Sequence, residues 1–251
     1  MLLSWFQDKR KQDDDELTQR GDWPEELPLL PLRNVVAFPF TMLPLAVGQP
    51  RSVRLLEHVL EGDHLLVLAA MKDPSVPEPG PEGIYEVGTL AHIERALRAD
   101  GEEFQIVVRC LGRVRIAEWL AEEPFLRVRV EAMPEEASEG LEVEALRREL
   151  LALARRLIVF FPQVPEGIVD MLDRAANAQT LVYLLASNVR LEVEQAQRIL
   201  EAPAVSAQMR LLLGIMQREL EVLELGKKIR DQAQSEMEHV QREFFLRQQM
   251  K

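Results

Sequence analysis

The C-terminal stretch, residues 204–251, constrains the fold more than any other part of the chain, because its apolar residues recur with the period of an α-helix. These residues follow one another mostly three or four positions apart from Leu211 to Phe244. At about 1.5 Å rise per residue, an unbroken helix of this length would be a rod of about 70 Å. That is longer than any domain that the preceding residues could build. No Gly, Asn or Pro follows to end the helix. We therefore expect a long helix that leaves the folded part, in a sequence cut inside that helix.

The far end of this helix carries an apolar stripe, Met237, Val240 and Phe244, which no later part of the sequence can cover. One explanation is that residues outside this sequence bury the stripe in the intact protein. The other is that the stripe pairs with the same helix of another copy, as in a coiled coil. These three are the candidate helix-pairing residues.

Charge and cysteine content narrow the class of protein. The net charge of −12 disfavours binding to nucleic-acid phosphates and to an anionic membrane surface. A single cysteine rules out an internal disulfide and fits a reducing compartment. No apolar run approaches about 18 residues, and the N-terminus is too short and too weakly basic to be a signal peptide. We expect a cytoplasmic protein with no membrane contact, for which nucleic acid is an unfavourable partner.

Residues 25–133 are predicted to form a mostly antiparallel β-domain, closed or nearly so. Alternating apolar and polar residues flank Asp100-Gly101, which is the strongest short-range signal for a hairpin. Prolines bound the strands predicted at 27–32 and 42–47, and prolines of this kind belong at strand starts or sheet edges. The continuous apolar run at 64–70 predicts a strand buried on both faces.

The remaining segments complete an α+β organisation. Residues 1–24 alternate clusters of charge and are predicted to be a flexible tail. Residues 134–140 are predicted to be a linker, and 141–203 a helical bundle that buries the first part of the long helix 204–251. Asn177 is a plausible N-cap within this bundle.

Catalytic signatures are missing from the sequence. The only Gly-Lys pair, Gly226-Lys227, lacks the first glycine of a phosphate-binding loop. The four histidines are scattered, with no partner at metal-ligand spacing. Cys110 falls on the apolar face of a predicted strand, which favours a small buried side chain over a reactive thiol. We therefore assign no catalytic, cofactor-binding or metal-binding residue.

The loop between the two proline-bounded strands could bind a partner. It carries Phe38 and Phe40, and Met42 follows directly. Two interpretations stay open: these residues plug the end of the barrel as core, or they form an apolar contact for a partner or an unfolded client. These three are the candidate client-binding residues.

Several segments resemble one known family. Residues 27–48 resemble the opening motif of Lon ATP-dependent proteases, and 86–91 and 112–116 resemble later strands of the same domain. Residues 226–230 and 241–251 resemble the long helix that precedes the ATPase module of that family. The resemblance covers about residues 25–251, in order, and its closing motif is specific.

The resemblance implies a PUA-like pseudo-barrel, then a helical bundle and a long helix, truncated before the ATPase domain. It implies the substrate-recognition and assembly region of a cytoplasmic homohexameric serine protease that degrades misfolded or damaged proteins. ATP and Mg²⁺ would serve domains absent here, so no cofactor is expected in this chain. The alternative is a stand-alone PUA-like adaptor that recognises a folded partner. RNA binding through the barrel is a third possibility, which the acidic charge disfavours.

Overall fold

The computed structural model describes residues 23–24, 26–98, 103–133, 140–161, 172 and 175–249, with side chains as far as Met237 in the last helix. Four predicted features lie outside these residues. They are the flexible tail before Trp23, the hairpin turn at Asp100-Gly101, most of the linker 134–140, and residues 162–171, 173 and 174 of the predicted helical bundle.

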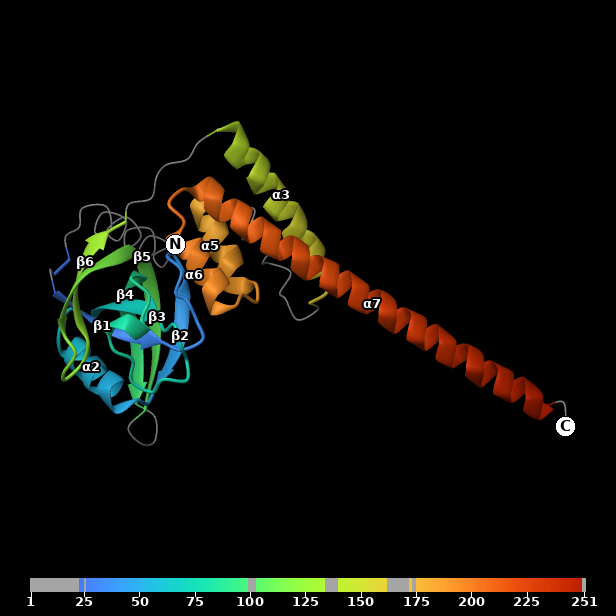
Figure 1. Ribbon diagram of the computed structural model, residues 1–251, viewed down its shortest axis with the longest axis horizontal. Coiled ribbons are helices and arrows are strands. Elements are labelled where there is room, and N and C mark those ends of the chain that lie inside the picture. Colours follow the sequence, from blue (N-terminus) through green and yellow to red (C-terminus); the bar gives the residue numbers. More distant parts are fainter. Residues whose placement is uncertain are drawn as a thin grey trace, which may run out of the picture.

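The chain forms a β-rich part followed by helices (Figure 1). The β-rich part contains, in order, β1 (Glu26–Leu32), β2 (Met42–Val47), α2 (Pro50–Glu61), β3 (Leu65–Ala70), the 3-10 turn η1 (Pro81–Gly83), β4 (Val87–Arg98), β5 (Phe104–Ala121) and β6 (Arg127–Ala132). The helical part contains α3 (Leu141–Ile158), α5 (Ala178–Asn188), α6 (Val193–Glu201) and α7 (Val205–Gln249). This α+β order confirms the predicted fold class.

The six strands lie in the order β2-β5-β4-β3-β1-β6, and the additional pairing of β5 with β6 closes the sheet into a barrel, with β2 added at the first half of β5. Closure depends on the length of β5. Its first half pairs with β2 and its second half with β6, while β4 lies along most of it. Only β1 and β3 pair in parallel; the other pairings are antiparallel. The prediction of a mostly antiparallel barrel is therefore confirmed.

Side-chain alternation explains how the strands sit in the barrel. Along the first half of β5, Phe104, Ile106 and Val108 are buried, while Gln105 between them is exposed. From Leu66 to Ala70, every residue of β3 is buried, as its continuous apolar sequence predicts. The strand β2 pairs only with β5, so it is an edge strand. Pro44 in the middle of β2 has no N–H, which agrees with the edge position predicted from the prolines.

The helical part packs around the first half of α7. Two ion pairs, Arg210 with Glu142 and Arg156 with Glu224, show that α3 runs parallel to α7. The N-cap predicted for α5 is present, because the Asn177 side chain accepts a hydrogen bond from the backbone N–H of Thr180 at 2.8 Å. The buried centre consists of apolar side chains from all four helices, including Leu150, Leu153, Leu181, Ile199, Met209 and Leu212.

The long helix leaves the bundle as predicted. Leu220 is the last buried side chain of α7 in the part for which side chains are described. Beyond it the helix extends away from the rest of the molecule to Gln249 (Figure 1).

The barrel and the bundle are joined by one continuous apolar cluster. Val36, Phe38 and Val87 of the β-rich part belong to the same buried cluster as the helical residues. Polar side chains reinforce the joint. Gln197 on α6 donates to the backbone carbonyl oxygen of Val87 at 2.9 Å. Arg113 on β5 is 3% exposed and donates to two backbone carbonyl oxygens at the end of α6. The orientation of the bundle on the barrel is thus fixed by packing and by directional bonds.

Candidate functional site

The loop between β1 and β2 separates its two aromatic residues. Phe38 is 3% exposed and stacks on Tyr183 of α5, with ring centroids 5.8 Å apart. Phe40 is 39% exposed, and its ring centroid lies 6.2 Å from that of Tyr183. Met42, at the start of β2, is 54% exposed. Of the three candidate client-binding residues, Phe38 therefore belongs to the core, and Phe40 and Met42 form the accessible surface.

Side-chain and backbone hydrogen bonds hold this loop. Thr89 Oγ1 donates to the carbonyl oxygen of Ala37 at 2.7 Å, and Thr41 Oγ1 donates to that of Phe38 at 2.6 Å. The backbone N–H of Phe40 donates to the carbonyl oxygen of Cys110 at 2.9 Å. Phe40 has a φ of 62°, in the left-handed region that costs an L-residue roughly 1–2 kcal/mol. A large apolar side chain is thus presented to solvent from a strained backbone.

The Tyr183 ring lies next to both aromatic rings of the loop and is itself completely buried. Its hydroxyl accepts a hydrogen bond from Gln179 Nε2 at 2.6 Å. Gln179 Nε2 also lies 2.9 Å from Gln208 Oε1, on α7. The loop, α5 and α7 are therefore linked through side chains of one buried network. No pattern in the sequence marks Tyr183 as a site residue, because its contact with the loop depends on how the bundle docks on the barrel.

A groove of about 320 Å³ lies between this loop and the helices. We call it the junction groove. One wall is formed by residues 34–38 and 41–44, and the other by 186–189, 191, 193 and 196. None of these lining residues is charged. Met42 lines the groove, so the exposed surface of the loop continues into it.

A second cavity, of about 430 Å³, lies beside α2 and the ends of β1 and β2. Its lining mixes core residues such as Leu30 with charged ones such as Arg33 and Glu103. The Arg51 side chain there donates to the carbonyl oxygens of Glu122 and Pro79, so its guanidinium already binds two loops of the β-rich part.

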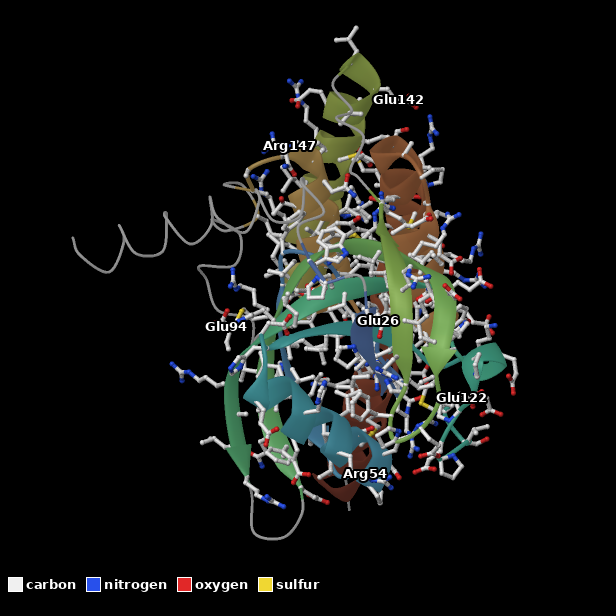
Figure 2. The ribbon with its side chains drawn as sticks, turned by 90° about the vertical axis from the view of Figure 1, so that its left-hand side faces the viewer. Glu26, Arg54, Glu94, Glu122, Glu142 and Arg147 are labelled. Carbon is white, nitrogen blue, oxygen red and sulfur yellow. The ribbon has the colours of Figure 1, made fainter. Side chains whose placement is uncertain are left out.

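Carboxylates and the thiol do not form a reactive constellation in the described part of the chain. Glu94 and Glu122 lie on opposite sides of the barrel in Figure 2. The described residues contain no group of three or more His, Cys, Asp or Glu side chains that could hold a metal ion. Burial raises the pKa of the Cys110 thiol to about 12. Cys110 is thus a buried side chain, as the sequence predicts.

The candidate helix-pairing stripe is described at one of its three positions. Met237 is 64% exposed, while the side chains of Val240 and Phe244 lie outside the described residues. Further apolar side chains of α7 between the bundle and Met237 are also more than half exposed: Val222, Leu225 and Ile229. The described part of α7 beyond the bundle therefore presents apolar side chains to solvent.

Comparison with known proteins identifies the class to which this architecture belongs. Residues 26–218 match a family model described as the ATP-dependent protease La (LON) substrate-binding domain. The chain is thus a substrate-binding domain of an ATP-dependent protease family. Because the match covers more than half of the sequence, the chain belongs to the Lon protease family.

Curated relatives show how much of such a protein the chain represents. It is 38% identical over 239 residues to a Lon protease of Dictyoglomus thermophilum, covering 94% of this chain and 30% of the relative. It is 36% identical over 236 residues to Lon protease 2 of Myxococcus xanthus, covering 94% of this chain and 28% of the relative. The chain therefore spans less than a third of the length of these relatives.

Solved structures support the fold. The N-terminal domain of a Lon protease of the Mycobacterium avium complex superimposes with a TM-score of 0.63 at 22% identity, covering 76% of this chain and 98% of that one. A Lon N-terminal domain protein from Xanthomonas campestris gives a TM-score of 0.50 at 18% identity, covering 75% and 97%. Among the described residues, no helix combines the length and the apolar character needed to span a membrane.

Proposed function

We propose that this chain is the client-recognition and assembly region of a homohexameric, cytoplasmic ATP-dependent serine protease that degrades misfolded or damaged proteins. In the whole protein, ATP, Mg²⁺ and the proteolytic residues would belong to domains that follow this region. The region itself would bind exposed apolar segments of unfolded clients. The family match and the length of the curated relatives support this assignment of client binding to this region and of ATP use and proteolysis to later domains.

The exposed ring and left-handed backbone of Phe40 are the observation that supports client binding. A phenylalanine in a left-handed conformation, 39% exposed, is unfavourable for stability on two counts. Residues held in such conformations cluster at functional sites, where the surrounding structure keeps them in place. Here, the hydrogen bonds of the loop and the Tyr183 ring do so. Phe40 and Met42 together offer the apolar surface that an unfolded segment would contact, with Phe38 supporting them from the core.

Assembly would use the exposed length of α7. Met237, Val240 and Phe244 continue the apolar side of this helix beyond the bundle, and Met237 is exposed. A helix of this kind is marginal alone in water and is stabilised when another surface packs against it. Pairing between copies would supply that surface.

Binding to denatured and native forms of one model protein tests the client-recognition role. We expect the chain to bind a reduced, carboxymethylated protein and not its native form. The double variant Phe40→Ser, Met42→Ser should lose most of this binding. Leu97→Ser is the matched control, because Leu97 is 68% exposed at a distant strand end. If the native form binds equally well, the chain is instead an adaptor for folded partners. Salt-dependent binding of labelled RNA would favour the barrel as an RNA-binding module.

A further inference from the structure

The junction groove brings together two parts of the chain that are far apart in sequence. Its first wall comes from the β1–β2 loop and β2, and its second from the end of α5 and the start of α6. Figure 1 shows α5 and α6 beside β2, on the side of the barrel that faces the bundle. Phe38 is shared between the groove lining and the buried cluster that joins the two parts. A ligand in the groove would therefore contact the barrel and the bundle at once.

The lining of the groove limits what can occupy it. Although charged residues make up 29% of the chain, none lines the groove. Most of the lining side chains are apolar, and four are neutral and polar: Asn34, Thr41, Ser187 and Asn188. Three of these four are already engaged. Thr41 Oγ1 donates to the carbonyl oxygen of Phe38, and Ser187 Oγ and Asn188 Nδ2 both donate to that of Leu184, at 3.0 and 2.7 Å. A charged side chain placed here would lose water without gaining an opposite charge, which costs several kcal/mol.

The volume and the edge strand indicate the mode of binding. About 320 Å³ is at the lower end of the roughly 300–1,000 Å³ typical of small-molecule pockets. This is enough for a large apolar side chain and part of its neighbour. The edge strand β2 passes along the groove, but Pro44 provides no N–H for a continuous hydrogen-bonded ladder. Insertion of side chains is therefore favoured over addition of a complete strand.

We propose that the junction groove is a client subsite that receives an uncharged aromatic or aliphatic side chain from an extended, unfolded segment. This inference rests on the proposed client-recognition function and locates it. Met42 lines the groove on the side of the β1–β2 loop, which also carries the exposed Phe40, and the α5–α6 connection forms the far wall. Val189, Leu191 and Val193 are then specificity-determining contacts. A client residue with a carboxylate or an ammonium group would be rejected at this subsite.

A fluorescent reporter can test occupancy of the groove. Cys110 is the only cysteine and is buried, so a Ser187→Cys variant can be labelled selectively with bimane at the groove. A Ser75→Cys variant, in an exposed loop of the barrel outside the groove lining, provides the control label. The probes are two unstructured ten-residue peptides that differ at one position, a central Phe in one and Glu in the other. The Phe peptide should change the fluorescence at position 187 but not at position 75, and the Glu peptide should bind at least about tenfold more weakly.

Substitutions on the helical wall complete the test. Leu191→Glu places a charge inside the groove. Ser187→Glu also places a charge in the groove lining, but at an exposed position, so this variant should fold normally. Each should weaken binding of the Phe peptide about tenfold, whereas Leu97→Glu should not. If the chain binds denatured protein through Phe40 and Met42, but the label at 187 stays silent and Ser187→Glu has no effect, the groove is not the subsite and the proposed function stands. If no unfolded protein or peptide binds the unmodified chain, the proposed function itself fails.

Discussion

Arg113 Nη1 lies 3.0 Å from the backbone carbonyl oxygen of Leu200, and this hydrogen bond ties the barrel to the end of α6. The same nitrogen donates to the carbonyl oxygen of Ala202 at 2.9 Å. A positive charge is favourable at a helix C-terminus, where unpaired carbonyl groups concentrate negative potential. Two of the last carbonyl groups at the end of α6 are thus capped by a residue of β5.

Replacing Arg113 should destabilise the whole chain. Arg113→Met keeps most of the side-chain volume but leaves buried carbonyl oxygens without their donor, which costs about 1.5–3 kcal/mol. Arg113→Lys keeps the charge and should recover part of that loss. Urea denaturation followed by circular dichroism measures both. As a control, Arg115→Met removes an exposed arginine of the same strand and should change stability by less than about 0.5 kcal/mol. Equal stabilities for Arg113→Met and Arg115→Met would show that the hydrogen bonds from Arg113 to the end of α6 do not stabilise the chain.

The two loop aromatics should respond differently to truncation. Phe38 is buried against Tyr183, so Phe38→Ala should cost about 3–5 kcal/mol of unfolding free energy. Phe40 is 39% exposed, so Phe40→Ala should cost clearly less. Client binding should show the opposite order when the folded fractions are compared. Thermal melts and binding to carboxymethylated protein check the two halves of this prediction. Similar losses of stability would mean that Phe40 is also core.

The backbone at position 40 allows a matched comparison. Phe40→Ala and Phe40→Gly both remove the ring, but only glycine adopts the observed φ of 62° without steric cost. Phe40→Gly should therefore be more stable than Phe40→Ala by about 1 kcal/mol. Leu43, on an ordinary strand backbone, provides the control, because Leu43→Gly should be less stable than Leu43→Ala. If glycine is no better than alanine at position 40, the strain argument for this loop is wrong.

Most of the architecture follows from the sequence because local signals agree with the tertiary fold. The alternation of β5, the prolines of the edge strand, the Asn177 cap and the long periodic stretch each indicate their element without knowledge of the rest. The parallel pairing of β1 with β3 is different, since it depends on how α2 covers the barrel between them.

The site could be predicted only in part. The sequence singled out Phe38, Phe40 and Met42 but could not decide which are exposed, because that depends on α5, whose Tyr183 lies some 140 residues further along the chain. In the sequence, Arg113 and Arg115 alternate with Val114 and Ile116, a pattern that predicts a solvent-facing side chain at position 113. Its burial arises only when α6 packs over that face of β5. The far wall of the junction groove left no signal, since Val189, Leu191 and Val193 look like ordinary core residues.

The thiol of Cys110 should stay unreactive until the protein unfolds. Burial raises its pKa from 9.0 to about 12, so the folded chain holds the proton in the range where an unfolded chain releases it. The stabilising contribution is fully present below pH 9 and declines as the pH rises from 9 toward 12. The stability difference between the unmodified chain and Cys110→Ala should therefore shrink between pH 8 and pH 11. Alkylation by iodoacetamide at pH 8 should follow the rate of unfolding. Rapid alkylation of the native chain would contradict this prediction.

The exposed length of α7 leads to the last prediction. Met237, Val240 and Phe244 would each gain roughly 1.5–3 kcal/mol if fully buried. Among the side chains described, however, the last apolar one of α7 that packs against the buried cluster of the bundle is Leu223. Charges on this part of the helix are balanced in the sequence, where Lys228 follows Glu224 and Arg242 follows Glu238 after four residues. Repulsion between two such helices is therefore small, and we expect concentration-dependent association through the apolar stripe.

Sedimentation of the double variant Met237→Glu, Phe244→Glu tests this association. Four like charges facing one another in a pair of helices should abolish it. The melting of the bundle should be unchanged, because Met237 lies beyond Leu220 and is 64% exposed. The control variant Gln232→Glu, Ser235→Glu adds the same charge at exposed polar positions of α7 and should still associate. If the first variant associates as strongly as the unmodified chain, the contact between copies lies elsewhere, and the barrel becomes the surface to mutate next.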